Sequence, residues 1–137
     1  MPPAPASYPH SYRRKVHFAD TDAAGVAHFS RVLCYVEEAE HDLLSSLGIP
    51  LLEDGGWPRA QVRCDYQAPL HVNEVAEVSL TLGEIGTSSL KWNFKIACGN
   101  KIIASGSYTT VRVDVSGKPA PISKAWHTLL SAGLPAE

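Results

Sequence analysis

The 137-residue chain lacks several features that mark large classes of proteins. Its three cysteines, Cys34, Cys64 and Cys98, lie far apart and form no CxxC pair. This spacing fits neither a disulfide framework nor a zinc motif, so we expect reduced, half-buried thiols in a cytoplasmic protein. The formal net charge of −2 offers no basic surface, which argues against nucleic acid as a partner. No apolar run approaches the roughly 18 residues that a membrane span needs.

The chain also lacks the signature of a secretion signal. Residues 1–10 hold neither a basic region nor an apolar core, and proline recurs in them. We therefore expect a disordered leader over residues 1–10 and one domain over residues 11–137. The content of hydrophobic residues, 45%, and of charged residues, 19%, is typical of a globular fold.

One long helix is the strongest local prediction. Between about Ser30 and Leu47, apolar residues recur at helical spacing, and acidic residues fill much of the remainder. Gly48 followed by Pro50 is a helix stop. A second, short helix is predicted over residues 123–131.

Strand patterns dominate the rest of the chain. A first strand is predicted over residues 12–18, and four more over residues 59–67, 74–84, 88–98 and 101–114. The short turns between these four strands predict an antiparallel meander whose apolar face the long helix covers, which is an α+β fold. Such a sheet is too large for one helix to cover, so we expect the chain to form a homodimer.

Two carboxylates stand where the first strand gives way to the helix. Asp20 and Asp22 are followed by a loop of small residues that contains Gly25. A helix N-terminus presents unpaired backbone N–H groups, so a carboxylate there lies beside a site for an oxyanion. The pattern alone leaves two alternatives, namely aspartates that only cap the turn and helix, or a magnesium-dependent phosphotransferase. The phosphotransferase is disfavoured because that chemistry usually needs strands that alternate with helices.

The segment from residue 12 to about residue 115 resembles the 4-hydroxybenzoyl-CoA thioesterase family of hotdog-fold acyl-CoA thioesterases. The resemblance rests on F-A-D-T-D-A-A-G-V-A-H-F at 18–29, E-E-A-E at 37–40, R-C-D-Y-Q-A-P at 63–69 and G-T-S-S-L at 86–90. It implies a hotdog fold, in which a five-stranded antiparallel sheet wraps one long central helix. It also implies an acyl-CoA thioesterase that uses no cofactor or metal and forms a homodimer or a dimer-of-dimers tetramer.

By this resemblance Asp22 is the catalytic carboxylate, acting as a nucleophile or as a general base. The backbone N–H near Phe29 would polarise the thioester carbonyl, and Gly25 would let the backbone approach the substrate. Asp20 is expected to hold the turn. Some members carry a histidine where this chain has Phe29, and here the imidazole is His28, one place earlier. Two roles stay open for His28: orienting water or the thioester, or a purely structural hydrogen bond.

The resemblance also implies where the substrate binds. Trp57 and Pro58 would line the acyl pocket, and the indole favours an aromatic or short acyl group. Hydroxybenzoyl, dihydroxynaphthoyl and short branched groups all fit this expectation. The turn at 86–89 is neutral where some members are basic, which leaves an acyl carrier protein open as the thiol carrier. The residues expected to contact coenzyme A are Arg59, Thr87, Ser88 and Ser89.

Three other functions share parts of this pattern. A second hotdog branch uses a glutamate on the central helix, so Glu37 and Glu38 are the alternatives to Asp22. We expect both glutamates to be solvated or at a subunit interface. A hydratase would pair His28 with Asp22. A hotdog protein that binds acyl-CoA or acyl carrier protein without turnover would need no catalytic carboxylate.

Overall fold

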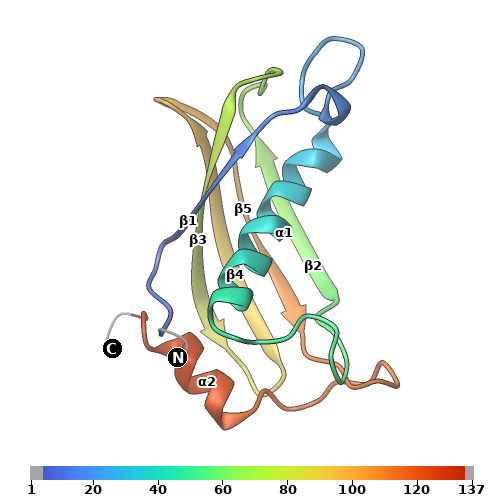
Figure 1. Cartoon of the computed structure of the whole chain (residues 1–137), viewed down its shortest axis with the longest axis vertical. Helices are drawn as coiled ribbons and strands as arrows, with labels where there is room; N and C mark the ends of the chain where they lie inside the picture. Colours follow the sequence, from blue (N-terminus) through green and yellow to red (C-terminus); the bar gives the residue numbers. More distant parts are fainter. Residues whose placement is uncertain (1–4, 135–137) are drawn as a thin grey trace.

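A five-stranded antiparallel sheet curves around one long helix (Figure 1). The computed structural model describes residues 5–134. The predicted α+β architecture, with a long helix, five antiparallel strands and a short C-terminal helix, is confirmed. The elements are β1 (His10–Lys15), η1 (Phe18–Asp20), α1 (Phe29–Ser46), β2 (Arg59–Tyr66), β3 (Val75–Ile85), β4 (Ser89–Cys98), β5 (Lys101–Val111) and α2 (Lys124–Ser131).

The strands lie in the order β1-β3-β4-β5-β2. β3, β4 and β5 form the expected meander and are joined by short turns. The meander prediction is wrong for β2, because residues 67–74 carry the chain across the sheet and β2 pairs with β5 instead of β3. β1 and β2 are therefore the two edge strands of the sheet.

The core lies between α1 and the sheet. In each of these elements, the period of the apolar residues in the sequence determines which side chains are buried. Alternate residues of β4 are buried, as the strict alternation of its sequence predicts. α1 buries one stripe of residues at a spacing of three and four. Each fully buried Leu, Ile or Val contributes about 1.5–3 kcal/mol to folding, so this interface holds the helix on the sheet. The buried apolar residues of the two elements are Leu90, Trp92, Phe94 and Ile96 on β4, and Val32, Tyr35, Val36, Ala39, Leu43 and Leu44 on α1.

The first strand begins and ends earlier than the predicted range of 12–18. β1 ends at Lys15, and Val16 N–H donates to the carbonyl oxygen of Glu74, just before β3, at 2.8 Å. The chain then leaves the sheet and forms η1, a short 3₁₀ helix. Phe18 is consequently 83% exposed, although its residue type favours a strand.

Residues 5–9 pack against α2, in place of the disordered leader that their composition predicted. Ala6 is buried, and its N–H donates to the Leu129 carbonyl oxygen at 3.2 Å. The Tyr8 hydroxyl donates to the Leu130 carbonyl oxygen at 3.1 Å. The rest of the predicted leader, residues 1–4, lies outside the described residues.

The sheet has two ends that carry different loops (Figure 1). The helix-start end carries the loop 21–28, which precedes α1, and the loop 67–74. The helix-stop end carries the loop 47–58, the turn 86–88 and the segment 112–134. β3 joins the two ends with 11 residues, which is about 35 Å at a rise of about 3.3 Å per residue.

Candidate active site

The loop between η1 and α1 is a tight hairpin that carries Asp22. Thr21 pairs with Ala27 as an isolated antiparallel bridge, and Asp22 N–H donates to the Val26 carbonyl oxygen at 2.9 Å. Gly25 takes a φ of 76°, a left-handed conformation that glycine adopts without strain. The hairpin therefore places Asp22 opposite Val26, just before the start of α1.

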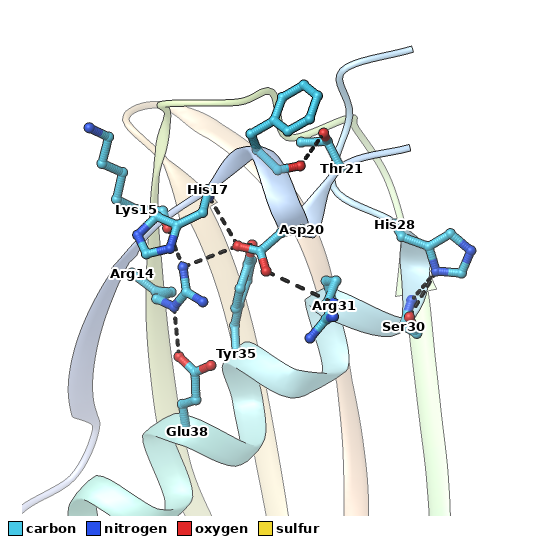
Figure 2. A network of polar contacts seen from close by, with 11 residues as sticks. Arg14, Lys15, His17, Asp20, Thr21, His28, Ser30, Arg31, Tyr35 and Glu38 are labelled. Atoms are coloured by element: carbon cyan, nitrogen blue, oxygen red, sulfur yellow. Dashed lines mark hydrogen bonds and ion pairs between the residues drawn. The ribbon is translucent and has the colours of Figure 1, made fainter. Parts of the chain in front are cut away.

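Asp20, the other carboxylate of the motif, is buried at the base of this hairpin (Figure 2). Its Oδ2 accepts hydrogen bonds from His17 N at 3.0 Å, the Tyr35 hydroxyl at 2.9 Å and Arg14 Nη1 at 3.1 Å. Burial alone would raise the pKa of this carboxyl, but the hydrogen bonds and the charge of Arg14 lower its pKa below the ordinary value. The Asp20 carbonyl oxygen also accepts from His28 N at 2.9 Å. Asp20 thus holds the turn, as predicted, and ties it to the start of α1.

The same network continues from Arg14 to Glu38 on α1 (Figure 2). Glu38 Oε1 accepts from Arg14 Nε at 3.0 Å and from the Tyr12 hydroxyl at 2.9 Å. Glu38 is partly buried by these contacts, which differs from the solvated or subunit-interface position that we expected. Because both donors come from β1, the Glu38 carboxylate links α1 to the sheet.

The Asp22 carboxylate itself is exposed at the tip of the hairpin. Its Oδ1 accepts from Ala24 N at 2.9 Å and from Val26 N at 3.4 Å, which is an Asx turn. Its Oδ2 has no hydrogen-bond partner among residues 5–134. One oxygen thus orients the carboxylate, and the other is open to a reacting group.

The start of α1, which follows the hairpin directly, provides an unpaired donor. The backbone N–H of Phe29, the first residue of α1, has no acceptor within the described part of the chain. His28 caps the helix: its Nδ1 accepts from Ser30 N at 3.3 Å and lies 2.8 Å from Ser30 Oγ. Accepting at Nδ1 places the proton of a neutral ring on Nε2. The structure thus supports the structural role of His28, and its catalytic role stays a prediction.

A cavity of about 380 Å³, the helix-start cavity, opens at this point. Its lining is mostly apolar and includes Val26, Phe29, Val32, Leu70 and Ile103. Tyr66 at the end of β2 also lines it and donates its hydroxyl to the Phe29 carbonyl oxygen at 2.9 Å. No role was predicted for Tyr66, although it lies within the motif R-C-D-Y-Q-A-P at 63–69.

The residues predicted to bind the acyl group line a different cavity. Trp57, Pro58 and Arg59 border a space of about 400 Å³, the helix-middle cavity, together with Leu51, Leu52, Gly56 and two residues of α1, Glu37 and His41. Glu37 lies eight residues after Phe29, which is about 12 Å along the helix. Within one chain, this cavity is therefore separate from the start of α1.

Arg59 is already paired with carboxylates of α1. Its Nη2 donates to Glu40 Oε1 at 2.7 Å, and its Nη1 lies 3.3 Å from Glu37 Oε2. These contacts neutralise the guanidinium locally, so they do not favour the predicted contact with coenzyme A. Glu40 is fully buried, and burial raises the pKa of its carboxyl. Glu40 was not predicted as a buried residue, although a carboxylate on the apolar stripe, four residues after Val36, is a signal for a buried ion pair.

The turn predicted to contact coenzyme A lies at the helix-stop end. Gly86 N–H donates to the Ser89 carbonyl oxygen at 2.8 Å, which closes the turn that contains Thr87 and Ser88. The Ser88 carbonyl oxygen accepts from Arg112 N at 2.6 Å. The structure therefore brings Asp22, Gly25, His28 and Phe29 together at one end of the sheet, and it places Trp57, Pro58, Arg59, Thr87, Ser88 and Ser89 toward the other.

Other kinds of site have no support in the described residues. They contain no group of three or more His, Cys, Asp or Glu residues that could hold a metal ion. The three cysteines are free and half-buried, as predicted. Neither α-helix in the described part of the chain is long and apolar enough to cross a membrane.

Comparison with known proteins gives a consistent result. Residues 16–130 match the family profile described as the Thioesterase-like superfamily. A 1,4-dihydroxy-2-naphthoyl-CoA hydrolase of Synechococcus sp. (strain CC9902) is 29% identical over 126 residues, covering 81% of this chain and 85% of that protein. The crystal structure of a 1,4-dihydroxy-2-naphthoyl-CoA thioesterase from Synechocystis has a TM-score of 0.81 at 27% identity, over 90% of this chain and 96% of that one. A thioesterase from Thermus thermophilus, crystallised with coenzyme A and Zn, has a TM-score of 0.81 at 25% identity, over 92% and 95%.

Proposed function

This chain belongs to the thioesterase-like superfamily, and from that membership we propose that it hydrolyses an aromatic or short-chain acyl-CoA with Asp22 as the catalytic carboxylate. Its fold is the hotdog fold that the sequence predicted, and it is a thioester hydrolase. The products would be the free acid and coenzyme A.

The observation that carries this proposal is the pairing of an open carboxylate with an unpaired backbone donor. Asp22 Oδ2 is open, and the Phe29 N–H faces no acceptor within residues 5–134, at the mouth of the apolar helix-start cavity. A thioester carbonyl oxygen bound at Phe29 N–H would be polarised, and one such donor stabilises the transition state by about 3–4 kcal/mol. Asp22 would then attack the carbonyl carbon directly, which breaks the C–S bond, releases the thiolate and leaves a mixed anhydride that water hydrolyses. Alternatively, Asp22 would take a proton from a water that attacks the carbonyl carbon, and the thiolate would leave as the C–S bond breaks.

The two ends of the sheet become one site when two copies pair. β2 is an edge strand, and its Val62 and Tyr66 are 44% and 47% exposed. Antiparallel pairing of β2 with β2 of a second copy would place the Arg59 end of one strand beside the Tyr66 end of the other. The helix-middle cavity of one copy would then adjoin Asp22 of its partner. We therefore propose a homodimer, or a dimer of such dimers, with two shared sites per dimer.

The chemistry of the helix-middle cavity and of the turn at 86–89 supports the choice of substrate. The helix-middle cavity has an indole, Trp57, in a largely apolar wall, and indoles stack well on flat acyl groups. The relatives named for 1,4-dihydroxy-2-naphthoyl-CoA act on an aromatic acyl group of this kind. The neutral turn at 86–89 offers hydroxyls and backbone amides, which would serve a coenzyme A or an acyl carrier protein.

A thiol-release assay on Asp22→Asn tests the proposal. The substrates are benzoyl-, 1,4-dihydroxy-2-naphthoyl- and isobutyryl-CoA, with one acyl carrier protein thioester. Asparagine keeps the Oδ1 that accepts from Ala24 N, so we expect the fold and the oligomer to persist. We expect turnover to fall by about a thousandfold or more, because no carboxylate remains to attack or to activate water.

The matched control is Asp42→Asn, which neutralises an exposed carboxylate on α1 that contacts only His10 among the described residues. Turnover of this variant should match that of the unchanged chain. Retained turnover in Asp22→Asn would refute its role, and Glu37 and Glu38 would then be tested. Tight acyl-CoA binding by the unchanged chain with no released thiol would instead favour a binding protein.

A further inference from the structure

The helix-stop end contains a buried arginine that no carboxylate neutralises within the described residues. Arg112 is 6% exposed and follows directly after β5. Its guanidinium carbon lies 4.8 Å from the ring centroid of Trp126 on α2 and 5.6 Å from that of Trp57. The two indoles are themselves 6.0 Å apart between centroids. Arg112 is therefore held by the rings of two tryptophans.

The polar contacts of Arg112 point to the same loop that carries Trp57. Its Nη2 donates to the carbonyl oxygens of Glu53 at 3.4 Å and Asp54 at 3.3 Å. Its Nη1 has no hydrogen-bond partner in the described part of the chain. A buried cation is costly unless it is compensated, and here the compensation comes from ring faces and loop carbonyls. The side chain therefore ties the loop 47–58 to the end of β5.

The backbone fixes the loop at the same place. Gly56 and Val113 exchange hydrogen bonds at 3.0 and 3.2 Å, and Val111 N–H donates to the Pro58 carbonyl oxygen at 2.9 Å. Trp57 stands between these anchors and is 8% exposed, yet its remaining surface lines the helix-middle cavity. The indole itself is held by the Arg112 guanidinium on its face and by the hydrogen bond from its Nε1 to the Pro50 carbonyl oxygen at 3.4 Å.

Trp126 is held from behind in turn. Its backbone N–H donates to Ser123 Oγ at 3.2 Å, which caps α2. The contacts of Ala6 and Tyr8 with Leu129 and Leu130 hold the other end of α2. α2 is therefore fixed at both ends, and it holds the Trp126 indole against Arg112 and Trp57.

We propose that Arg112 and Trp126 are positioning residues that hold Trp57 in the wall of the helix-middle cavity and so limit the size of the acyl group that is hydrolysed. The inference rests on the proposed function, because it takes this cavity as the acyl site. Removing the Trp126 indole leaves space behind Arg112 and Trp57, so the wall of the cavity can recede. Larger acyl groups then gain relative to smaller ones, while Asp22, at the helix-start end, is not touched.

The test compares kcat and KM for acetyl-, isobutyryl-, benzoyl- and 1,4-dihydroxy-2-naphthoyl-CoA. In Trp126→Ala, the ratio of kcat/KM for the largest to the smallest acyl group should rise by about tenfold. The change should appear in KM, with kcat for the smallest substrate kept within about threefold. Trp126→Phe keeps an aromatic face over Arg112 and should restore the original preference. Arg112→Lys keeps the charge but loses the flat stacking surface, so it should shift preference in the same direction as Trp126→Ala.

Thr128→Ala is the matched control, because the Thr128 hydroxyl donates only to the Lys124 carbonyl oxygen of its own helix. If Trp126→Ala does not fold, Trp126→Leu, which keeps apolar volume at the site, carries the same test. If Trp126→Ala and Arg112→Lys are active and less stable but keep the original preference for acyl size, then Arg112 and Trp126 only stabilise the fold, and the inference is overturned. An unchanged chain that hydrolyses no member of the panel would overturn the proposed function, and the inference with it.

Discussion

The hydrogen bonds of Asp20 predict how the stability of the chain responds when the charge of this residue is removed. Asp20→Asn keeps the shape of the side chain but removes its negative charge. In the folded chain three donors converge on one oxygen, from His17 N, Tyr35 Oη and Arg14 Nη1. A neutral amide accepts more weakly from all three and adds N–H donors of its own.

The magnitude follows from the burial of the group. Asp20 is 5% exposed, and removing one partner from a buried charge pair costs about 3–5 kcal/mol. Arg14 is only partly buried and keeps Glu38 as a second partner, so we expect the low end, about 3 kcal/mol or roughly 10 °C in Tm. Tyr35→Phe removes a single donor and should cost about 1–2 kcal/mol. Urea denaturation followed by tryptophan fluorescence measures both free energies of unfolding.

The dependence on pH separates this mechanism from a general packing defect. The folded-state pKa of Asp20 is lowered, so its stabilisation is complete above the unfolded pKa of about 3.9 and is lost as the pH falls through the folded pKa. The difference in unfolding free energy between the unchanged chain and Asp20→Asn should therefore be constant from pH 7 to about pH 5 and then narrow toward pH 3. Equal stability at pH 7, or a difference that does not narrow, would refute this account of the loop.

Two further predictions concern the β2 edge and the loop 47–58. Val62→Lys adds a charge in the middle of the β2 edge, so it should convert the proposed dimer to a folded monomer in light scattering and abolish turnover in the thiol-release assay. Val115→Lys, which replaces an exposed valine outside the strands, should change neither property. A Val62→Lys dimer would place the interface elsewhere. Gly55→Ala should lower the free energy of unfolding by about 2–3 kcal/mol in the same urea assay, because the φ of Gly55 is 140° and a Cβ would overlap the Val113 carbonyl oxygen. In the control Gly56→Ala the added Cβ meets no atom within 4 Å, so the free energy of unfolding should barely change. Equal effects of the two substitutions would show that the loop 47–58 is not held as described.

The sequence predicted those elements whose periodicity is decided locally. α1 begins and ends within about one residue of its predicted limits, because the apolar stripe and the Gly48 stop act on neighbouring residues. β1 could not be placed as well. Phe18 has a strand-forming side chain, but the Asp20 carboxylate and the pairing of Val16 with Glu74 turn the chain out of the sheet. Both contacts are tertiary or involve a turn, so local propensity did not reveal them.

The residues of the candidate site also fall into those that the local sequence predicts and those that depend on tertiary contacts. Asp22, Gly25 and Phe29 lie in one short segment, and the structure places all three at the helix-start end, while their roles stay a prediction. Tyr66 and Glu40 take their roles from a cross-sheet contact and from burial, respectively. Glu40 interrupts an apolar stripe and could have been noticed. Tyr66 reaches the carbonyl of Phe29 from a different element, and a single sequence holds no signal for that contact.

The residues at the helix-start end, such as Asp22, are separate from those predicted to bind the substrate, such as Trp57 and Thr87. This separation is the strongest support for a site that two copies share. A motif search assigns Asp22 and Trp57 to one active site because both match one family, and it says nothing about which copy supplies each. In the structure Asp22 precedes the start of α1, whereas Trp57 lies in the loop 47–58 beside the middle of α1, and Thr87 lies at the opposite end of β3, which is about 35 Å long. This separation within one chain is why we proposed a site that two copies share. In the proposed dimer, a two-fold axis across the β2 edge would bring the helix-start end of each copy beside the helix-middle cavity of the other, once on each side of the axis. The homodimer that was expected because one helix cannot cover the sheet would thus also complete the proposed catalytic site.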